Sequence, residues 1–386
     1  MRVLGISGLA NAKPFKRSQW PDLDEREYSI LPGSNGAAAM VVDGELIALQ
    51  ESGTEERSNQ KRADDFQFSA MQECLARVNL TYKDIDALVH AYDYSPYEEL
   101  YLISKSGAAL YREVLSREAL LKQLRRYFPK LPKERVRQVP HHLAHAAGAY
   151  CTSGWTDCVV LVIDGLSEGQ GITAYFVRGG HFEEIKEIVL ANSIGAFLGL
   201  IAMHLGFAFQ DDEQKVMQLA RDGDPSRFRP FFELAVQLGR EGSILIPPLW
   251  RNKARRDQEF YLATRRYISD YVGPAKLPSD EITQRHRDIG AGLDECLGRV
   301  LLHLCRYLRT VTGVPRIAIA GDFAVNYQVS RHVIGAGVFE EVFMPDASGD
   351  DGSAVGAALL GAMAEAGTNR TLLPWRDIES RLSFRL

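Results

Sequence analysis

The same order of predicted elements occurs twice in this chain. The first run starts with a short apolar strand at residues 3–6, then a hairpin around Asp43-Gly44 and a helix at residues 66–78. The second starts with the continuous apolar run of residues 158–164 and continues with two more strand candidates and a long helix. Apolar strands that alternate with helices are typical of α/β proteins. The repeated order, without a repeat at the level of residues, predicts two related lobes that face a cleft.

The chain length is compatible with this division, because 386 residues exceed what one small core usually holds. We place an N-terminal lobe at residues 1–155, a C-terminal lobe at residues 156–366 and a short tail at residues 367–386. The N-terminal lobe carries a polar, proline-containing insertion at residues 9–34. It also carries an amphipathic, basic helical segment at residues 98–137, whose charged face is expected to be solvated.

The composition argues against several classes of protein. The chain is 46% hydrophobic and 25% charged, as soluble domains are, and its net charge of -5 does not favour nucleic acid as a partner. No apolar stretch approaches the roughly 20 residues of a membrane span, and we interpret the N-terminus as mature protein rather than as a signal peptide. The five cysteines include no C-x-x-C pair. We interpret them as free thiols and expect a cytoplasmic protein.

Three of the nine histidines fall within five consecutive positions. His141 and His145 are four residues apart, so on a helix they share one face, with Cβ atoms about 6 Å apart. Two imidazoles in this arrangement can bind one metal ion. Histidines that cap or pack the start of a helix explain the pattern equally well, so the pattern alone leaves both interpretations open.

A glycine-rich turn follows the apolar run of residues 158–164. Asp164 ends this run, and a carboxylate there points into the crevice where α/β sheets bind ligands. Gly165, Gly169 and Gly171 would let backbone N–H groups approach a phosphate. A plain Asp-Gly turn is the alternative.

Three further segments carry candidate site residues. Gly349 and Asp350 lie in a loop before an alanine-rich helix, where N–H groups could bind an anion and carboxylates a metal. An N-cap would explain one of the two acidic residues in that loop. Gly321 follows the apolar strand of residues 317–320 in a turn that could lie against a base or ribose. Lys215 lies on the first turns of a predicted helix, which a simple capped helix explains equally well.

Together, five motifs resemble the O-carbamoyltransferases of nodulation-factor and antibiotic tailoring in order and spacing. They are His-His-Leu-Ala-His-Ala-Ala, a strand ending in Val-Ile-Asp-Gly, Glu-x-Lys-Val-Met-x-Leu-Ala, Ala-Gly-x-x-Ala-x-Asn and Gly-Asp-x-Gly. The resemblance runs from Val3 to about Ala366. It implies an actin-like ATPase fold, with two ribonuclease-H-like lobes around a cleft for nucleotide and metal.

The resemblance also implies roles for individual residues. Carried over residue by residue, it implies an Fe(II)-type metal, with Mn(II) or Zn(II) also suited to two nitrogen and two oxygen ligands. The metal ligands would be His141, His145, Asp164 and Asp350. ATP or carbamoyl-AMP would contact Gly8, Gly165, Gly169, Gly321, Asp322, Asn326 and Gly349. The catalytic residues would be the two histidines with Asn35 and Lys215.

Three departures from the family pattern qualify this assignment. Relatives carry an acidic residue in a loop directly after the first strand, whereas here about 25 residues intervene and the matching position is Asn35, which cannot act as a base. The family's Gly-Gly is Gly321-Asp322 here. The chain ends at Leu386, where larger members continue into a domain that makes carbamoyl-AMP.

The leading hypothesis is therefore an O-carbamoyltransferase. It would move a carbamoyl group from carbamoyl-adenylate, made by a separate protein, to a hydroxyl of a small molecule of secondary metabolism. The alternative is a catalytically weakened, nucleotide-binding partner subunit of a full-length carbamoyltransferase. Minor alternatives are a tRNA threonylcarbamoyl-type transferase and another acyl-adenylate chemistry. No membrane partner is expected.

Overall fold

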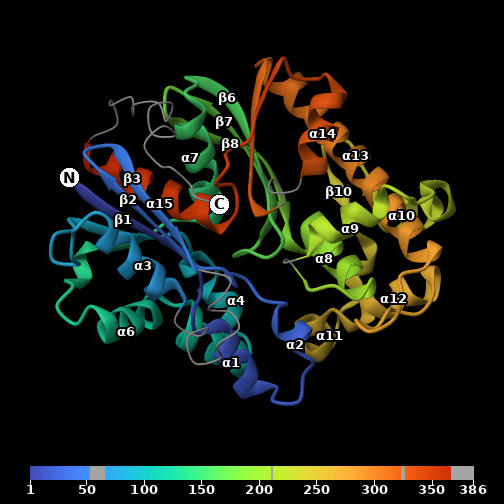
Figure 1. The fold of residues 1–386 in the computed structure, drawn as a ribbon, viewed down its shortest axis with the longest axis horizontal. Coiled ribbons are helices and arrows are strands. Elements are labelled where there is room, and N and C mark those ends of the chain that lie inside the picture. The colour runs from blue at the N-terminus through green and yellow to red at the C-terminus, as the bar shows by residue number, and fades with distance from the viewer. Residues whose placement is uncertain (53–65, 210–211, 323–326, 367–386) are drawn as a thin grey trace.

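Two five-stranded sheets organise the molecule (Figure 1). The computed structural model describes residues 1–52, 66–209, 212–322 and 327–366. The first sheet has the strand order β3-β2-β1-β4-β5, in which β1 is antiparallel to β2 and parallel to β4. Its strands are β1 (Arg2–Ser7), β2 (Ala37–Val42), β3 (Glu45–Glu51), β4 (Ala87–His90) and β5 (Val136–Gln138).

The second sheet repeats this topology. Its order is β12-β11-β6-β7-β8, and β6 is antiparallel to β7 and parallel to β11. Its strands are β6 (Asp157–Ile163), β7 (Gln170–Arg178), β8 (His181–Val189), β11 (Arg316–Ala320) and β12 (Glu341–Phe343). The predicted α/β fold with two ribonuclease-H-like lobes is confirmed, whereas the exact lobe bounds remain a prediction.

Burial on both faces explains why β1 and β6 lack polar side chains between their end residues. In β6, Val159 and Leu161 belong to one core cluster, and Val160 between them belongs to another. In β1, Val3 and Leu4 likewise face different clusters. Strands covered on both faces lose the apolar–polar alternation of half-exposed strands and become continuous apolar runs.

The predicted hairpin of the first sheet is also present. Asp43 and Gly44 connect β2 to β3 with φ angles of 51° and 91°. Two consecutive residues with positive φ make the type of turn whose twist matches the flanking strands, and Asp-Gly is a favoured pair for it.

Helices α7 (His141–Ser153) and α15 (Asp350–Ala366) pack against each other between the two sheets. α7 covers β6 and β11, while α15 covers β1 and β2. The helices cross closely because glycines lie at the contact. A Cβ atom on Gly356 would lie 1.7 Å from the carbonyl oxygen of Ala144, and one on Gly148 would lie 2.6 Å from that of Gly352. This crossing brings the start of α15 to the first turns of α7.

The predicted insertion at residues 9–34 folds into α1 (Ala12–Gln19) and α2 (Glu25–Tyr28), which lie beside the helices of the other lobe (Figure 1). The ring of Trp20 packs edge-on against Phe260, and Glu27 pairs with Arg265. The predicted helical segment 98–137 is helical as far as Tyr127, with α4 (Glu98–Leu102), α5 (Lys105–Leu110), a π-helical turn (Tyr111–Leu115) and α6 (Arg117–Tyr127), whereas its last residues enter β5. The other helices are α3 (Phe66–Arg77), α8 (Ile194–His204), α9 (Glu213–Ala220), α10 (Arg229–Ala235), α11 (Arg255–Phe260), α12 (Leu262–Val272), α13 (Gln284–Thr312) and α14 (Tyr327–Ala336).

In the described part of the chain, no helix combines the length and apolar character that crossing a bilayer requires. All five cysteines are free thiols, as predicted, and four of them are buried. Burial raises the pKa of each thiol to about 12, so the thiols stay protonated near neutral pH.

Candidate metal centre

The carboxyl ends of four strands converge on the crossing of α7 and α15. β1 ends at Ser7, and the segment after β4 carries Tyr92. β6 leads directly into Asp164, and β11 leads into Gly321. Parallel neighbours end at the same edge of a sheet, so the repeated topology places all four segments around one point.

Two histidines and one aspartate form a compact buried cluster at this point. The ligating atoms of His141, His145 and Asp164 all lie within 4.8 Å of one another. The Nε2 atoms of the two histidines are 3.0 Å apart, and Nε2 of His141 is 3.2 Å from Oδ2 of Asp164. The spacing of four residues on α7 directs both rings to the same side, as the sequence predicted.

Asp350, the fourth predicted ligand, is held next to this cluster. Its Oδ1 lies 4.0 Å from Nε2 of His141. The same oxygen accepts hydrogen bonds from the Ser7 hydroxyl at 2.7 Å and the Tyr92 hydroxyl at 3.2 Å. Ser353, one turn into α15, donates to Ser7 in turn. The carboxylate is therefore oriented by hydroxyls at the carboxyl ends of two neighbouring strands, β1 and β4, at the same edge of the first sheet.

The ring of His141 is fixed in the orientation that a metal ligand requires. Its Nδ1 lies 2.9 Å from the carbonyl oxygen of Ala91. Because a carbonyl oxygen can only accept a hydrogen bond, Nδ1 carries a proton and donates it. Nε2 is thereby the nitrogen that faces the cluster. The ring of Tyr92 stacks on His141, with centroids 4.0 Å apart, and restricts its rotation.

The buried carboxylates of the cluster would be stabilised by a cation at its centre. Burial alone disfavours a charged imidazole, yet the carboxylates of Asp164 and Asp350 raise the pKa of His141 to about 10. Burial and the neighbouring His141 lower the pKa of His145 well below its usual range. Oδ2 of Asp164 makes no hydrogen bond of regular geometry within the described part of the chain, and Nε2 of His141 lies 3.2 Å from it. A buried carboxylate oxygen without a well-aligned donor, next to two converging imidazoles, fits a divalent metal ion.

A second layer of buried groups supports the cluster, and the sequence analysis did not identify it. Oε1 of Glu168 accepts hydrogen bonds from the backbone N–H groups of His141 and Asp93. His142 contacts Thr173 and Ser167 through its two ring nitrogens. The one sequence signal for Glu168 is its place in the glycine-rich turn, four residues after Asp164.

The predicted nucleotide-contacting glycines lie in turns around this centre. Gly8 has a φ of 102°, and its carbonyl oxygen contacts His90. Gly321 has a φ of 96°, and its N–H donates to Ser348. The N–H of Gly165 donates to Asp164, so this group holds the carboxylate in place. Gly169 lies against the ring of Tyr97, and Gly349 is buried before α15.

The remaining predicted residues occupy different surroundings. Asn35 is half-buried two residues before Ala37, which pairs with Ser7, so Asn35 lies at the sheet edge that carries the centre. Lys215 is exposed on α9 and pairs with Asp212 at 2.7 Å. Asp322 is half-buried directly after Gly321. Asn326 lies outside the described residues.

The model of one known protein family matches most of this chain. Residues 33–359 match the model of the carbamoyltransferase N-terminus. Nodulation protein NolNO of Sinorhizobium fredii is 31% identical over 343 residues, covering 84% of this chain and 46% of that protein. Nodulation protein NolO of Bradyrhizobium diazoefficiens is 32% identical over 230 residues, covering 57% of this chain and 37% of that protein. The chain thus spans about half the length of the curated relatives it matches.

Solved structures align over most of the chain at low sequence identity. Component A of the (R)-2-hydroxyglutaryl-CoA dehydratase of Acidaminococcus fermentans covers 95% of this chain, with 16% identity and a TM-score of 0.46. The activator of the 2-hydroxyisocaproyl-CoA dehydratase of Clostridium difficile, with bound ADPNP, also covers 95%, with 14% identity and a TM-score of 0.47.

Proposed function

Because this chain belongs to the carbamoyltransferase family, matching its N-terminal domain, we propose that it transfers a carbamoyl group to a hydroxyl of a small-molecule acceptor. Carbamoyl-adenylate is the proposed donor, made by a separate protein or domain. The cytoplasm is the proposed site of the reaction, and secondary metabolism its proposed context.

One observation carries this proposal. His141, His145 and Asp164 converge in a buried cluster, with Asp350 held beside them. We propose that these four residues hold Fe(II), or else Mn(II) or Zn(II). A metal there would act as a Lewis acid that polarises the carbamoyl carbonyl or neutralises the adenylate phosphate.

The residues of the chain would prepare the site for this chemistry. Ala91 and Glu168 fix the position of His141 through its ring and its backbone. Ser7 and Tyr92 orient Asp350 through two hydroxyl donors. All of these side chains except that of Ala91 are polar and at least nine-tenths buried, so the site holds fixed dipoles where bulk water is excluded.

Proton removal from the acceptor hydroxyl needs a group other than Asn35. The amide of Asn35 can orient a hydroxyl by hydrogen bonding, but it cannot take up a proton. We propose that Asn35 positions substrate at the edge of the first sheet, and that the turns at Gly8, Gly165, Gly169, Gly321 and Gly349 contact the nucleotide.

The direct test is AMP release from carbamoyl-adenylate generated in place by an activating domain added separately, with water taking the carbamoyl group, as carbamate, where no acceptor hydroxyl is supplied. The assay is run anaerobically with Fe(II), and AMP is quantified by chromatography. We expect metal-dependent release that His145→Ala abolishes and that His181→Ala, an exposed histidine on β8, leaves unchanged. Release by His145→Ala at the rate of the unaltered protein would refute the proposal.

A second function is a partner subunit of a longer carbamoyltransferase that binds nucleotide without turning it over. Two observations favour it. Asn35 stands where relatives carry an acidic residue, and Lys215 of the family motif pairs on the surface with Asp212. Stable co-purification with a longer relative, combined with no AMP release by this chain alone, would support this function over the first.

A further inference from the structure

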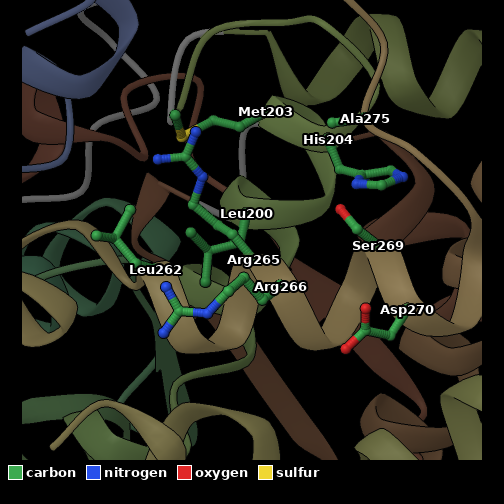
Figure 2. Close-up of a pocket in the computed structure, with 9 residues that line it drawn as sticks. All are labelled: Leu200, Met203, His204, Leu262, Arg265, Arg266, Ser269, Asp270 and Ala275. Carbon is green, nitrogen blue, oxygen red and sulfur yellow. The ribbon is translucent and has the colours of Figure 1, made fainter.

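A cavity of about 380 Å³ lies between α8 and α12, and none of its lining residues belongs to the metal centre. Leu200, Met203 and His204 line it from α8. The wall on α12 has helical spacing, with residues at positions 262, 265, 266, 269 and 270 (Figure 2). One face of α12 therefore faces α8 across unfilled space.

The two walls of this cavity differ in chemistry. The wall on α8 is apolar except for His204. The wall on α12 contains two arginines, Ser269 and Asp270, with Leu262 at one end. Facing helices normally bury apolar side chains at close-packed density, so a polar face opposite an open space is suited to a polar ligand rather than to packing.

His204 supplies an unused polar group in this cavity. Its side chain is 5% exposed, and Nε2 has no hydrogen-bond partner within the described residues. Burial, with the nearby charges of Arg285, His286 and Arg265, lowers its pKa to about 4. A neutral imidazole can donate or accept one hydrogen bond through this nitrogen, as a ligand hydroxyl requires.

The two arginines supply the cationic side of the cavity. Figure 2 shows their guanidinium groups extending to one side, with His204, Ser269 and Asp270 on the other. Arg265 pairs with Glu27 at 2.6 Å, and Arg266 pairs with Asp257 at 3.2 Å. A guanidinium group has five N–H donors, so each arginine keeps donors beyond these contacts. A guanidinium group suits a phosphate dianion in charge and in hydrogen-bonding geometry, and this side of the cavity has two of them.

We propose that this cavity binds a small hydroxylated molecule that carries a phosphate group. The phosphate binds at the side of the cavity that carries Arg265 and Arg266, and the hydroxyls face His204, Ser269 and Asp270. Asp270 accepts from hydroxyls and, by its negative charge, keeps the phosphate at the arginine side. Glu27 and Asp257 compete with the ligand for the two guanidinium groups.

Calorimetric titration tests this site directly. The probe is ribose 5-phosphate, with ribose and inorganic phosphate as reference ligands, at low ionic strength and with EDTA to remove metal. We expect ribose 5-phosphate to bind more tightly than either reference. Arg266→Gln should weaken binding about tenfold, since it removes charge-assisted hydrogen bonds. Asp257→Asn should tighten binding roughly threefold, because it removes a competing carboxylate that is partly exposed to solvent.

Two controls separate this site from others. Arg229→Gln removes an arginine that is paired with Glu295 elsewhere on the surface, and it should leave binding unchanged. His145→Ala should also leave binding unchanged, whatever its effect on carbamoyl transfer. No binding at millimolar ribose 5-phosphate, equal binding by Arg266→Gln, or loss of binding in His145→Ala would each overturn the proposal.

Discussion

Glu168 joins two segments of the centre through one carboxylate oxygen. That oxygen accepts the N–H groups of His141, at the start of α7, and of Asp93, after β4. Burial raises the pKa of Glu168, although both hydrogen bonds favour its ionised form. The residue contacts a proposed metal ligand through its backbone, so we regard it as a positioning residue.

Replacing Glu168 by alanine should leave the two N–H groups without an acceptor. We expect a loss of stability of about 1–3 kcal/mol and a 10- to 100-fold loss of metal affinity, as for other groups that orient a ligand. Glu168→Gln keeps an oxygen acceptor of the same length and should recover most of both. Urea unfolding and metal titration measure the two effects. Equal metal affinity in the alanine variant would show that His141 needs no such support.

The close crossing of helices α7 and α15 brings the residues of the centre together. Gly356→Ala would place a methyl group against the carbonyl oxygen of Ala144 and force the helices apart. We expect a loss of stability of about 1–3 kcal/mol, as for other overpacked contacts, together with weaker metal binding.

Gly335→Ala provides the matched control for this change, because Gly335 lies in α14 and a Cβ atom there meets nothing within 4 Å. It should stabilise the protein by about 0.5 kcal/mol through the lower entropy of the unfolded chain. If both variants unfold at the same urea concentration, the close helix crossing is not required.

The insertion carries a pH-dependent contact with the other lobe. Lys16 is buried between the Ile30 carbonyl, Glu259 and the ring of Phe260. Burial lowers its pKa from 10.5 to about 8, and Glu259 opposes this only in part. Between these two values the unfolded chain binds more protons at this site than the folded protein does, so stability rises with pH through this range.

Comparison of Lys16→Met with the unaltered protein isolates this contribution. Relative to the variant, the unaltered protein should gain about 2 kcal/mol of stability between pH 7 and pH 9.5. Urea unfolding at the two pH values measures the difference, in which other titrating groups cancel. A constant difference between the two proteins would mean that Lys16 keeps an ordinary pKa.

Over the whole molecule, local sequence patterns predicted the helices and strands. The residues that surround the site are brought together by contacts between distant parts of the chain, which such patterns do not show. The spacing of His141 and His145 predicted a shared helix face because both residues lie on one helix. Asp164 was predicted from its position after an apolar strand. The contact of Ser7 with Asp350 spans 343 residues, so no local pattern could indicate it. Tyr92 follows β4 without a glycine-rich turn, and its role depends on the packing of α15 beside β4.

The proposed metal would be bound by residues from both lobes. α7 supplies two histidines, the second sheet supplies Asp164, and Asp350 begins the helix that packs on the first sheet. The most direct test is the metal content of protein purified anaerobically after loading with Fe(II), measured by elemental analysis beside Asp164→Asn, His145→Ala and His181→Ala. We predict about one metal ion per chain in the unaltered protein and in His181→Ala, and little or none in the other two, since each loses a ligand of a four-ligand site. Full metal content in Asp164→Asn and His145→Ala, or none in the unaltered protein, would contradict the account.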